Sequence, residues 1–156
     1  MIVGVPAETK TLERRVAITP AGVSELRAAG HEVIVEAGAG RGSGIADRAY
    51  VAAGAGTIDE VYDEATLVLH VKEPQPRDLE RLRPRHVLFT YLHLAAYPEL
   101  AGALLETGAT AVAYETVQLA DGHLPLLAPM SRIAGRMAMQ AAAHYLQLDG
   151  FSTSQV

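Results

Sequence analysis

The sequence predicts an α/β fold: a Rossmann-like (flavodoxin-like), largely parallel sheet flanked by helices and ending in a long C-terminal helix. Two observations indicate the sheet. Short runs of valine, isoleucine and leucine alternate along the chain with segments of helical periodicity. Parallel neighbours require crossover connections, and those helical segments supply them. A third observation indicates the last helix, because apolar residues from Met130 onward recur at intervals of three and four.

Composition limits the classes of function. The chain has 156 residues, of which 49% are hydrophobic and 20% charged, as in one globular domain. A formal net charge of -5 without basic blocks argues against nucleic-acid and anionic-membrane partners. The absence of cysteine excludes disulfides and thiolate nucleophiles. Because the chain enters a strand-like run at Ile2 and lacks a long apolar stretch, we expect a cytoplasmic protein.

The first expected strand is residues 2–5, closed by a proline. A charged loop over residues 8–15 follows it. Thr19 then offers an N-cap, Pro20 suits the first helical position, and Gly30 ends the helix expected over residues 20–29.

A glycine-rich segment, residues 37–44, follows the second expected strand at residues 33–35. A dinucleotide-binding loop would need the pattern G-x-G-x-x-G between a strand and a helix. The third glycine of that pattern would fall on Ser43, Ile45 or Asp47, depending on the starting glycine. The segment is therefore interpreted as a turn that uses glycine for positive φ.

The other expected elements continue the alternation. Helices are expected at 47–53, 78–82 and 98–106, and strands at 67–71, 86–91 and 111–115. A hairpin is expected around Asp121-Gly122, with strands at 117–119 and 124–127. We divide the chain into an α/β domain (1–129), a long interdomain or oligomerisation helix (130–148) that Gly150 ends, and an irregular tail (149–156).

Three side chains that suit chemistry on a small acid come from strand ends or their loops: Arg15, Lys72 and His93. In an open α/β sheet, ligands bind at the carboxyl ends of the strands. Arginine and lysine can hold a carboxylate, and an imidazole can exchange a proton near neutral pH. The alternative is that Arg15 and Lys72 only form surface pairs with Glu13 and Glu73. The histidine spacing predicts no metal site, and no G-x-S-x-G nucleophile motif is present.

Five motifs in order resemble the N-terminal substrate domain of the alanine dehydrogenase and nicotinamide nucleotide transhydrogenase family. They are G-V-P-A-E (4–8), R-R-V-A-I-T-P (14–20), V-K-E-P (71–74), F-T-Y-L-H-L-A (89–95) and A-P-M-S-R-I-A-G (128–135). Transhydrogenase relatives typically lack the lysine and the histidine of the third and fourth motifs. Lys72 and His93 therefore favour the dehydrogenase.

The resemblance implies the chemistry of the site. Arg15 and Lys72 would hold the substrate carboxylate and keto oxygen, and His93 would donate or accept a proton beside the reacting carbon. The residues implied to line the pocket or the cofactor cleft are Glu73, Tyr91, Met130 and Ser131. The implied reaction converts L-alanine, NAD and water reversibly into pyruvate, ammonium and NADH. The implied small-molecule substrate is therefore L-alanine or pyruvate.

The resemblance also implies what this chain does not carry. In the family the long helix leads into a separate NAD-binding domain, so we expect a fragment or truncated form that is inactive alone. Family members are usually hexamers, which implies a homo-oligomer. Two alternatives stay open: a non-catalytic carboxylate-binding or oligomerisation module, and a domain of a transhydrogenase subunit.

Overall fold

The structure is a computed structural model that describes residues 1–147. Its centre is a six-stranded sheet in the order β3-β2-β1-β4-β5-β6, and every neighbouring pair of strands is parallel. The strands are β1 (Ile2–Val5), β2 (Glu32–Glu36), β3 (Gly56–Ile58), β4 (Leu67–Leu69), β5 (Val87–Thr90) and β6 (Thr110–Ala113). This is the strand order of the Rossmann fold, which confirms the predicted fold class.

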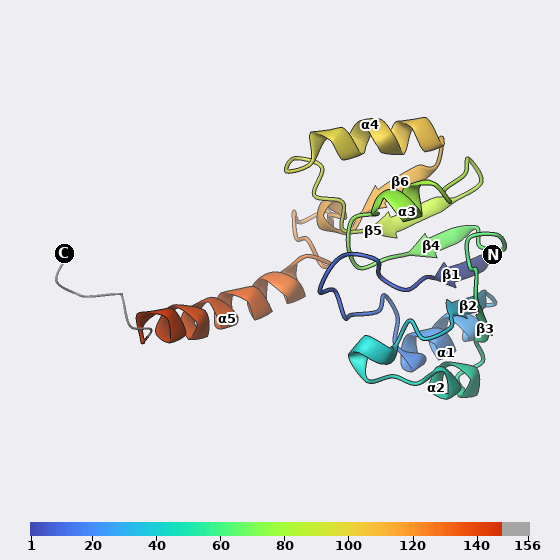
Figure 1. Cartoon of the computed structure of the whole chain (residues 1–156), viewed down its shortest axis with the longest axis horizontal. Coiled ribbons are helices and arrows are strands. Elements are labelled where there is room, and N and C mark those ends of the chain that lie inside the picture. The colour runs from blue at the N-terminus through green and yellow to red at the C-terminus, as the bar shows by residue number, and fades with distance from the viewer. Residues whose placement is uncertain (148–156) are drawn as a thin grey trace. The chain divides into compact units, whose positions relative to one another are not determined.

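Helices connect the strands on both faces of the sheet. They are α1 (Pro20–Ala28), α2 (Asp47–Ala52), α3 (Pro76–Leu79) and α4 (Pro98–Thr107), with the 3₁₀ turn η1 (Arg41–Ser43). The 3₁₀ turn η2 (Tyr114–Thr116) and helix α5 (Ala128–Leu146) follow the last strand. Figure 1 shows α1 and α2 on one side of the strands and α3 and α4 on the other. The predicted cap of α1 is confirmed, because the Thr19 hydroxyl accepts a hydrogen bond from the Gly22 N–H.

The core forms two layers because successive strand residues point to opposite faces. On β2, Val33 and Val35 pack with Tyr50 in the cluster that includes Val23 of α1, whereas Ile34 packs in the opposite cluster. The second cluster contains Val61, Tyr62, Ala65, Val68, Leu82, Leu88, Leu92, Leu100 and Leu104. Continuous apolar strands are expected when both faces of a parallel sheet are covered.

Two expectations about local structure were wrong. The strand β3 was not predicted, because a three-residue run that starts at Gly56 has almost no pattern of its own and forms by pairing with β2. The expected hairpin strands at 117–119 and 124–127 are not formed in this part of the described chain. A turn around Asp121-Gly122 is present, with Gly122 at φ 84°, and the Leu119 N–H donates a hydrogen bond to the His123 carbonyl across it.

The chain forms two compact units, Met1–Tyr114 and a second that begins at Glu115. The second unit contains α5, which begins two residues before the expected 130 and has no buried residue. The expected helix end at Gly150 and the tail 149–156 lie outside the described residues, and the predicted domain boundaries at 129 and 148 stay predictions. None of the helices within residues 1–147 is both long and apolar enough to cross a membrane.

Candidate functional site

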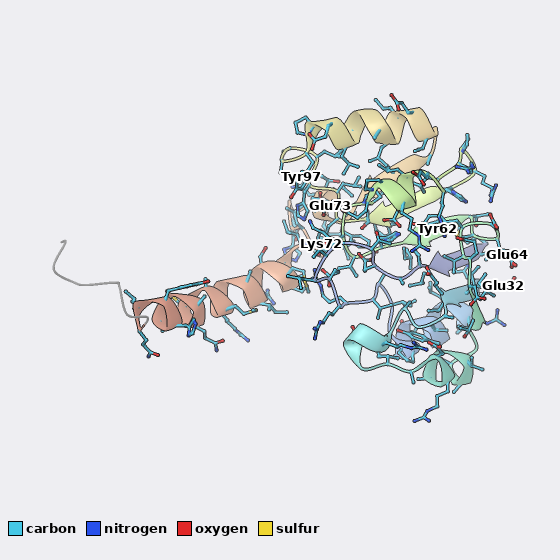
Figure 2. The ribbon with its side chains drawn as sticks, viewed as in Figure 1. Glu32, Tyr62, Glu64, Lys72, Glu73 and Tyr97 are labelled. Carbon is cyan, nitrogen blue, oxygen red and sulfur yellow. The ribbon has the colours of Figure 1, made fainter. Side chains whose placement is uncertain are left out.

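The central strands of the sheet bring three predicted site residues to one edge. β1, β4 and β5 are neighbours, and Arg15, Lys72 and His93 lie in the segments that follow them. The chain leaves β1 toward β2 on one side and returns to β4 on the other, so the strand order reverses beside β1. Ligands of open α/β sheets bind at such a switch point. Figure 2 shows Lys72 at the carboxyl edge of the sheet and Glu64 at the opposite edge.

Lys72 has a fixed main chain and an available ammonium group. Its N–H donates to Glu8 Oε2 at 3.1 Å, and its carbonyl accepts from the Thr90 hydroxyl at 2.7 Å. Among residues 1–147, no hydrogen bond or ion pair is found for its half-buried side chain. The alternative pairing of Lys72 with Glu73 is not formed, because Glu73 binds Lys10 instead.

Arg15 forms the ion pair with Glu13 that the sequence analysis gave as an alternative to substrate binding. Its Nη2 donates to Glu13 Oε2 at 2.6 Å, and its Nε donates to Oε1 at 2.9 Å. This side-chain hydrogen bonding lowers the pKa of Glu13 to about 2. The pKa of Arg15 is raised, first by Glu13 and then, more weakly, by the charges of Glu8 and Tyr91. Arg15 thus interacts electrostatically with Glu8, which binds the Lys72 main chain, and with Tyr91, which stacks on His93.

An aromatic cluster orients His93. Its ring stacks on Tyr91 with centroids 5.9 Å apart and planes 11° apart, and Tyr91 meets the edge of Tyr114 at 5.0 Å. Burial raises the pKa of Tyr114, so its hydroxyl stays protonated. The backbone of His93 has φ 51°, in the left-handed region that residues other than glycine rarely adopt. Backbone strain of this kind collects at functional sites.

Glu73 ties neighbouring loops together. Burial alone would raise the pKa of Glu73, but the hydrogen bond and charge of Lys10 lower it. The Lys10 ammonium also lies 5.6 Å from the centre of the Tyr97 ring. These three residues line a cavity of about 380 Å³ between the loops after β1, β4 and β5. The Oε2 atom of Glu73 is buried without a hydrogen-bond partner in the described chain.

A second cavity, of about 500 Å³, shares Gln75 and Pro76 with the first. It is lined by Ala7, Glu8, Thr9, Glu36, Tyr62, Gln75, Pro76, Arg77, Asp78 and Arg81. Neither of these two cavities is lined by Arg15, Lys72 or His93. A ligand held by those three residues would bind at the sheet edge outside both cavities.

The remaining predicted site residues belong to the second unit. Met130 and Ser131 lie in the first turn of α5, and both are exposed. Arg15, Lys72, Glu73, Tyr91 and His93 thus lie in the segments that follow three neighbouring strands of the first unit. Their roles, and those of Met130 and Ser131, stay predictions.

Sequence reasoning assigned no role to Glu8, His70 and Thr90. All three contact the Lys72 segment: Glu8 and Thr90 bind its main chain, and the His70 ring binds the Glu8 carboxylate at 3.0 Å. A usable signal was present, because His70 interrupts the apolar run of β4 and its flanks. A polar side chain inside a buried run must find a partner, and a carboxylate in the preceding strand-end loop is a natural one.

The glycine-rich turn at residues 37–44 packs closely against other parts of the chain. A Cβ atom on Gly40 would lie 2.7 Å from the Ile45 carbonyl oxygen, and one on Gly42 would lie 2.5 Å from the Arg14 carbonyl oxygen. The close backbone approach that glycine permits is therefore used by the chain itself. Gly38 and Gly44 have φ 82° and 75°, which confirms the interpretation as a turn. No cluster that could hold a metal ion is found within the described residues.

Comparison with known protein families gives one match over most of the chain. The family described as "Alanine dehydrogenase/PNT, N-terminal domain" matches residues 4–134. This range includes every predicted site residue.

Known alanine dehydrogenases are similar over nearly the whole chain. Those of Mycobacterium tuberculosis (strain H37Rv) and Bacillus subtilis are 58% and 56% identical over 94% of this chain. A solved L-alanine dehydrogenase matches with a TM-score of 0.87 and 47% identity over 94% of this chain and 41% of its own. A transhydrogenase from Sinorhizobium meliloti matches with a TM-score of 0.68 and 31% identity, over 74% of this chain and 35% of its own. The chain spans about 40% of the length of the relatives it matches.

Proposed function

This chain belongs to the alanine dehydrogenase/PNT N-terminal domain family, and we propose that it is the substrate-binding half of an NAD-dependent L-alanine dehydrogenase. The observation that carries the proposal is Lys72, whose ammonium has no ion-pair partner among residues 1–147 while its main chain is held from two strands. A half-buried lysine that forms no ion pair suits a small anion. The greater similarity to alanine dehydrogenases than to the transhydrogenase favours pyruvate or L-alanine over the transhydrogenase alternative.

In this proposal Lys72, Arg15 and His93 have different roles. Lys72 and Arg15 hold the substrate carboxylate and the keto oxygen, and Arg15 keeps its orientation through Glu13. His93, stacked on Tyr91, holds or releases the proton beside the reacting carbon. Anchoring the carboxylate fixes that carbon relative to the imidazole, which is the positioning part of catalysis.

The overall reaction proposed for the active protein is balanced as L-alanine, NAD⁺ and water giving pyruvate, ammonium, NADH and a proton. The glycines of the turn at residues 37–44 make room for the chain itself at Gly40 and Gly42, so they do not support an NAD site in this turn. We infer that NAD is held elsewhere in the active protein.

Calorimetric titration of sodium pyruvate into the chain tests the proposal. Saturable binding by the wild type, lost in Lys72→Met and kept in Arg77→Met, supports it. Arg77 is the matched control because it is an exposed cation on the adjacent helix α3. Equal heats for the wild type and Lys72→Met contradict it. Oxidation of NADH with pyruvate and ammonium would separate an enzyme from a non-catalytic carboxylate-binding module.

A homo-oligomer is proposed from α5. Along one side of this helix, Ile133, Met137 and Tyr145 are 51%, 60% and 60% exposed. Apolar side chains at this spacing favour burial against another surface. Sedimentation of the wild type, Met137→Glu and the control Ala143→Glu, at an exposed position on the opposite side of the helix, tests it. A loss of association confined to Met137→Glu is expected.

A further inference from the structure

A buried carboxylate lies under the segment that carries Lys72. The side chain of Glu8, in the loop after β1, is 4% exposed. Its Oε1 accepts hydrogen bonds from the Val71 N–H at 2.7 Å and from His70 Nδ1 at 3.0 Å, and its Oε2 accepts from the Lys72 N–H at 3.1 Å. One side chain from the β1 loop therefore holds three consecutive residues after β4.

A second side chain holds the other end of the same residue. Thr90, the last residue of β5, is fully buried, and its hydroxyl donates to the Lys72 carbonyl at 2.7 Å. The two peptide groups that flank the Lys72 Cα are thus bound from both neighbouring strands. Because the direction of a Cα–Cβ bond follows from its flanking peptide groups, the stem of the lysine starts from a fixed position.

The interior of the protein holds the carboxylate in turn. A carboxylate only accepts hydrogen bonds, so a hydrogen lies on His70 Nδ1, and Nε2 of the same ring forms a hydrogen bond with the Tyr62 hydroxyl at 2.8 Å. The Tyr62 hydroxyl lies farther, 3.4 Å, from Asp78 Oδ1. Asp78 is itself held by the Thr9 hydroxyl at 2.7 Å. Satisfied buried networks of this kind are rigid.

We propose that Glu8 is a positioning residue that sets Lys72 for a small carboxylate by holding the peptide N–H groups of Val71 and Lys72, with Thr90 fixing the Lys72 carbonyl. The proposal rests on the proposed function, because pyruvate is the carboxylate that Lys72 would bind. Glu8 is not a catalytic residue, since its two oxygens are occupied by the main chain and His70. Its charge matters because a carboxylate serves all three donors at once, whereas a carboxamide has only one oxygen.

The experiment compares Glu8→Gln with the wild type by amide hydrogen exchange and by titration with pyruvate. In the variant, exchange at Val71 or Lys72 is expected to be about tenfold faster, since a buried N–H loses a charged acceptor. Pyruvate affinity is expected to fall about fivefold to tenfold. The ¹⁵N signals of the His70 ring, which report the position of its proton, are expected to change. Glu64→Gln, an exposed glutamate at the opposite edge of the sheet, is the control and leaves all three unchanged.

If the Glu8→Gln chain does not fold, a second pair of variants tests the same proposal. Thr90→Val keeps the shape of the side chain and loses the hydroxyl, whereas Thr90→Ser keeps the hydroxyl. Weaker pyruvate binding in Thr90→Val, with wild-type affinity in Thr90→Ser, supports positioning of Lys72 through its main chain. Equal affinities in both variants overturn it.

The outcomes separate this proposal from the function on which it rests. A folded wild-type chain that binds no pyruvate overturns the proposed function, and exchange at Val71 and Lys72 then still decides whether Glu8 holds that segment. Exchange in Glu8→Gln that is as slow as in the wild type overturns the positioning proposal. Fast exchange with unchanged pyruvate affinity also overturns it, because Lys72 would not depend on Glu8.

Discussion

Two buried histidines, His70 after β4 and His86 before β5, are each 1% exposed but have different partners. The ring of His86 binds only main chain: Nδ1 accepts from the Arg83 N–H at 2.9 Å, and Nε2 donates to the Tyr62 carbonyl at 2.9 Å. The ring of His70 binds only side chains, those of Glu8 and Tyr62. Residue type and burial are the same, so they do not distinguish the two.

The partners do distinguish them. His86 forms hydrogen bonds with two buried peptide groups and fixes the segment that leads into β5, so its role is to stabilise the fold. His70 supports a carboxylate whose other contacts are the N–H groups of Val71 and Lys72. A change at the amino end of the strands should therefore alter folding alone, and a change at the carboxyl end should also alter the proposed site.

The largest expected effect is that of His86→Leu. The variant leaves the Arg83 N–H and the Tyr62 carbonyl buried without partners, which should lower the free energy of unfolding by about 3 kcal/mol. The affinity of the remaining folded chain for pyruvate should be unchanged. Urea unfolding and pyruvate titration measure the two quantities, with His123→Leu, at an exposed histidine, as the control. If folded His86→Leu binds pyruvate more weakly than the wild type, the two histidines do not differ in the way proposed.

Tyr62→Phe removes the hydroxyl between His70 and Asp78 and keeps the carbonyl that binds His86. We expect the free energy of unfolding to fall by about 1 to 2 kcal/mol, because two buried polar groups lose a shared partner. Pyruvate affinity should also fall, since His70 then supports Glu8 less firmly. Urea unfolding compares the variant with Tyr97→Phe, whose tyrosine is 39% exposed and whose stability should stay near that of the wild type. A loss of stability with full affinity would show that the hydroxyl acts on the fold only.

The pH dependence of stability sharpens the contrast further. Burial lowers the pKa of His86, and the charges of Arg85 and Arg83 add to this effect, although the bond to the Tyr62 carbonyl opposes it. In the unfolded chain the His86 ring binds a proton near its ordinary pKa of 6.5, whereas in the folded chain it binds one only at lower pH. Stability is therefore fully present above that value and declines as the pH falls from it toward the folded pKa. Urea unfolding at pH 7.5 and 5.5 should show this decline in the wild type, and His86→Leu should lose part of it.

The smallest expected effect concerns Glu13, whose pKa of about 2 lies below its ordinary value of 4.5 because of Arg15. The stabilisation is present above pH 4.5 and is lost as the pH falls toward 2. The Arg15 side chain is 46% exposed, so solvent screens the pair and the loss should stay below about 1 kcal/mol. Acid unfolding of the wild type and Glu13→Gln measures it. An equally steep acid transition in both chains would contradict the assigned pKa.

The contrast between the histidines also shows what the sequence could predict. The alternation of strands and helices, the cap at Thr19 and the location of Lys72 after a strand follow from local patterns, and the structure agrees with them. The partners of Lys72 and Glu73 could not be predicted in this way. Glu73 binds Lys10 rather than its neighbour because the β1 loop crosses the end of β4, and this depends on contacts between residues far apart in the sequence.

The most direct test of the central claim is an NMR titration of the chain, with ¹⁵N-labelled lysine and histidine, by sodium pyruvate. The account predicts that the signals of Lys72 and the His93 ring shift together and saturate at one pyruvate concentration, while the His86 ring signals do not move. Shifts at His86 without shifts at Lys72, or a folded chain whose Lys72 and His93 signals stay fixed at millimolar pyruvate, would contradict a carboxylate site at this edge of the sheet.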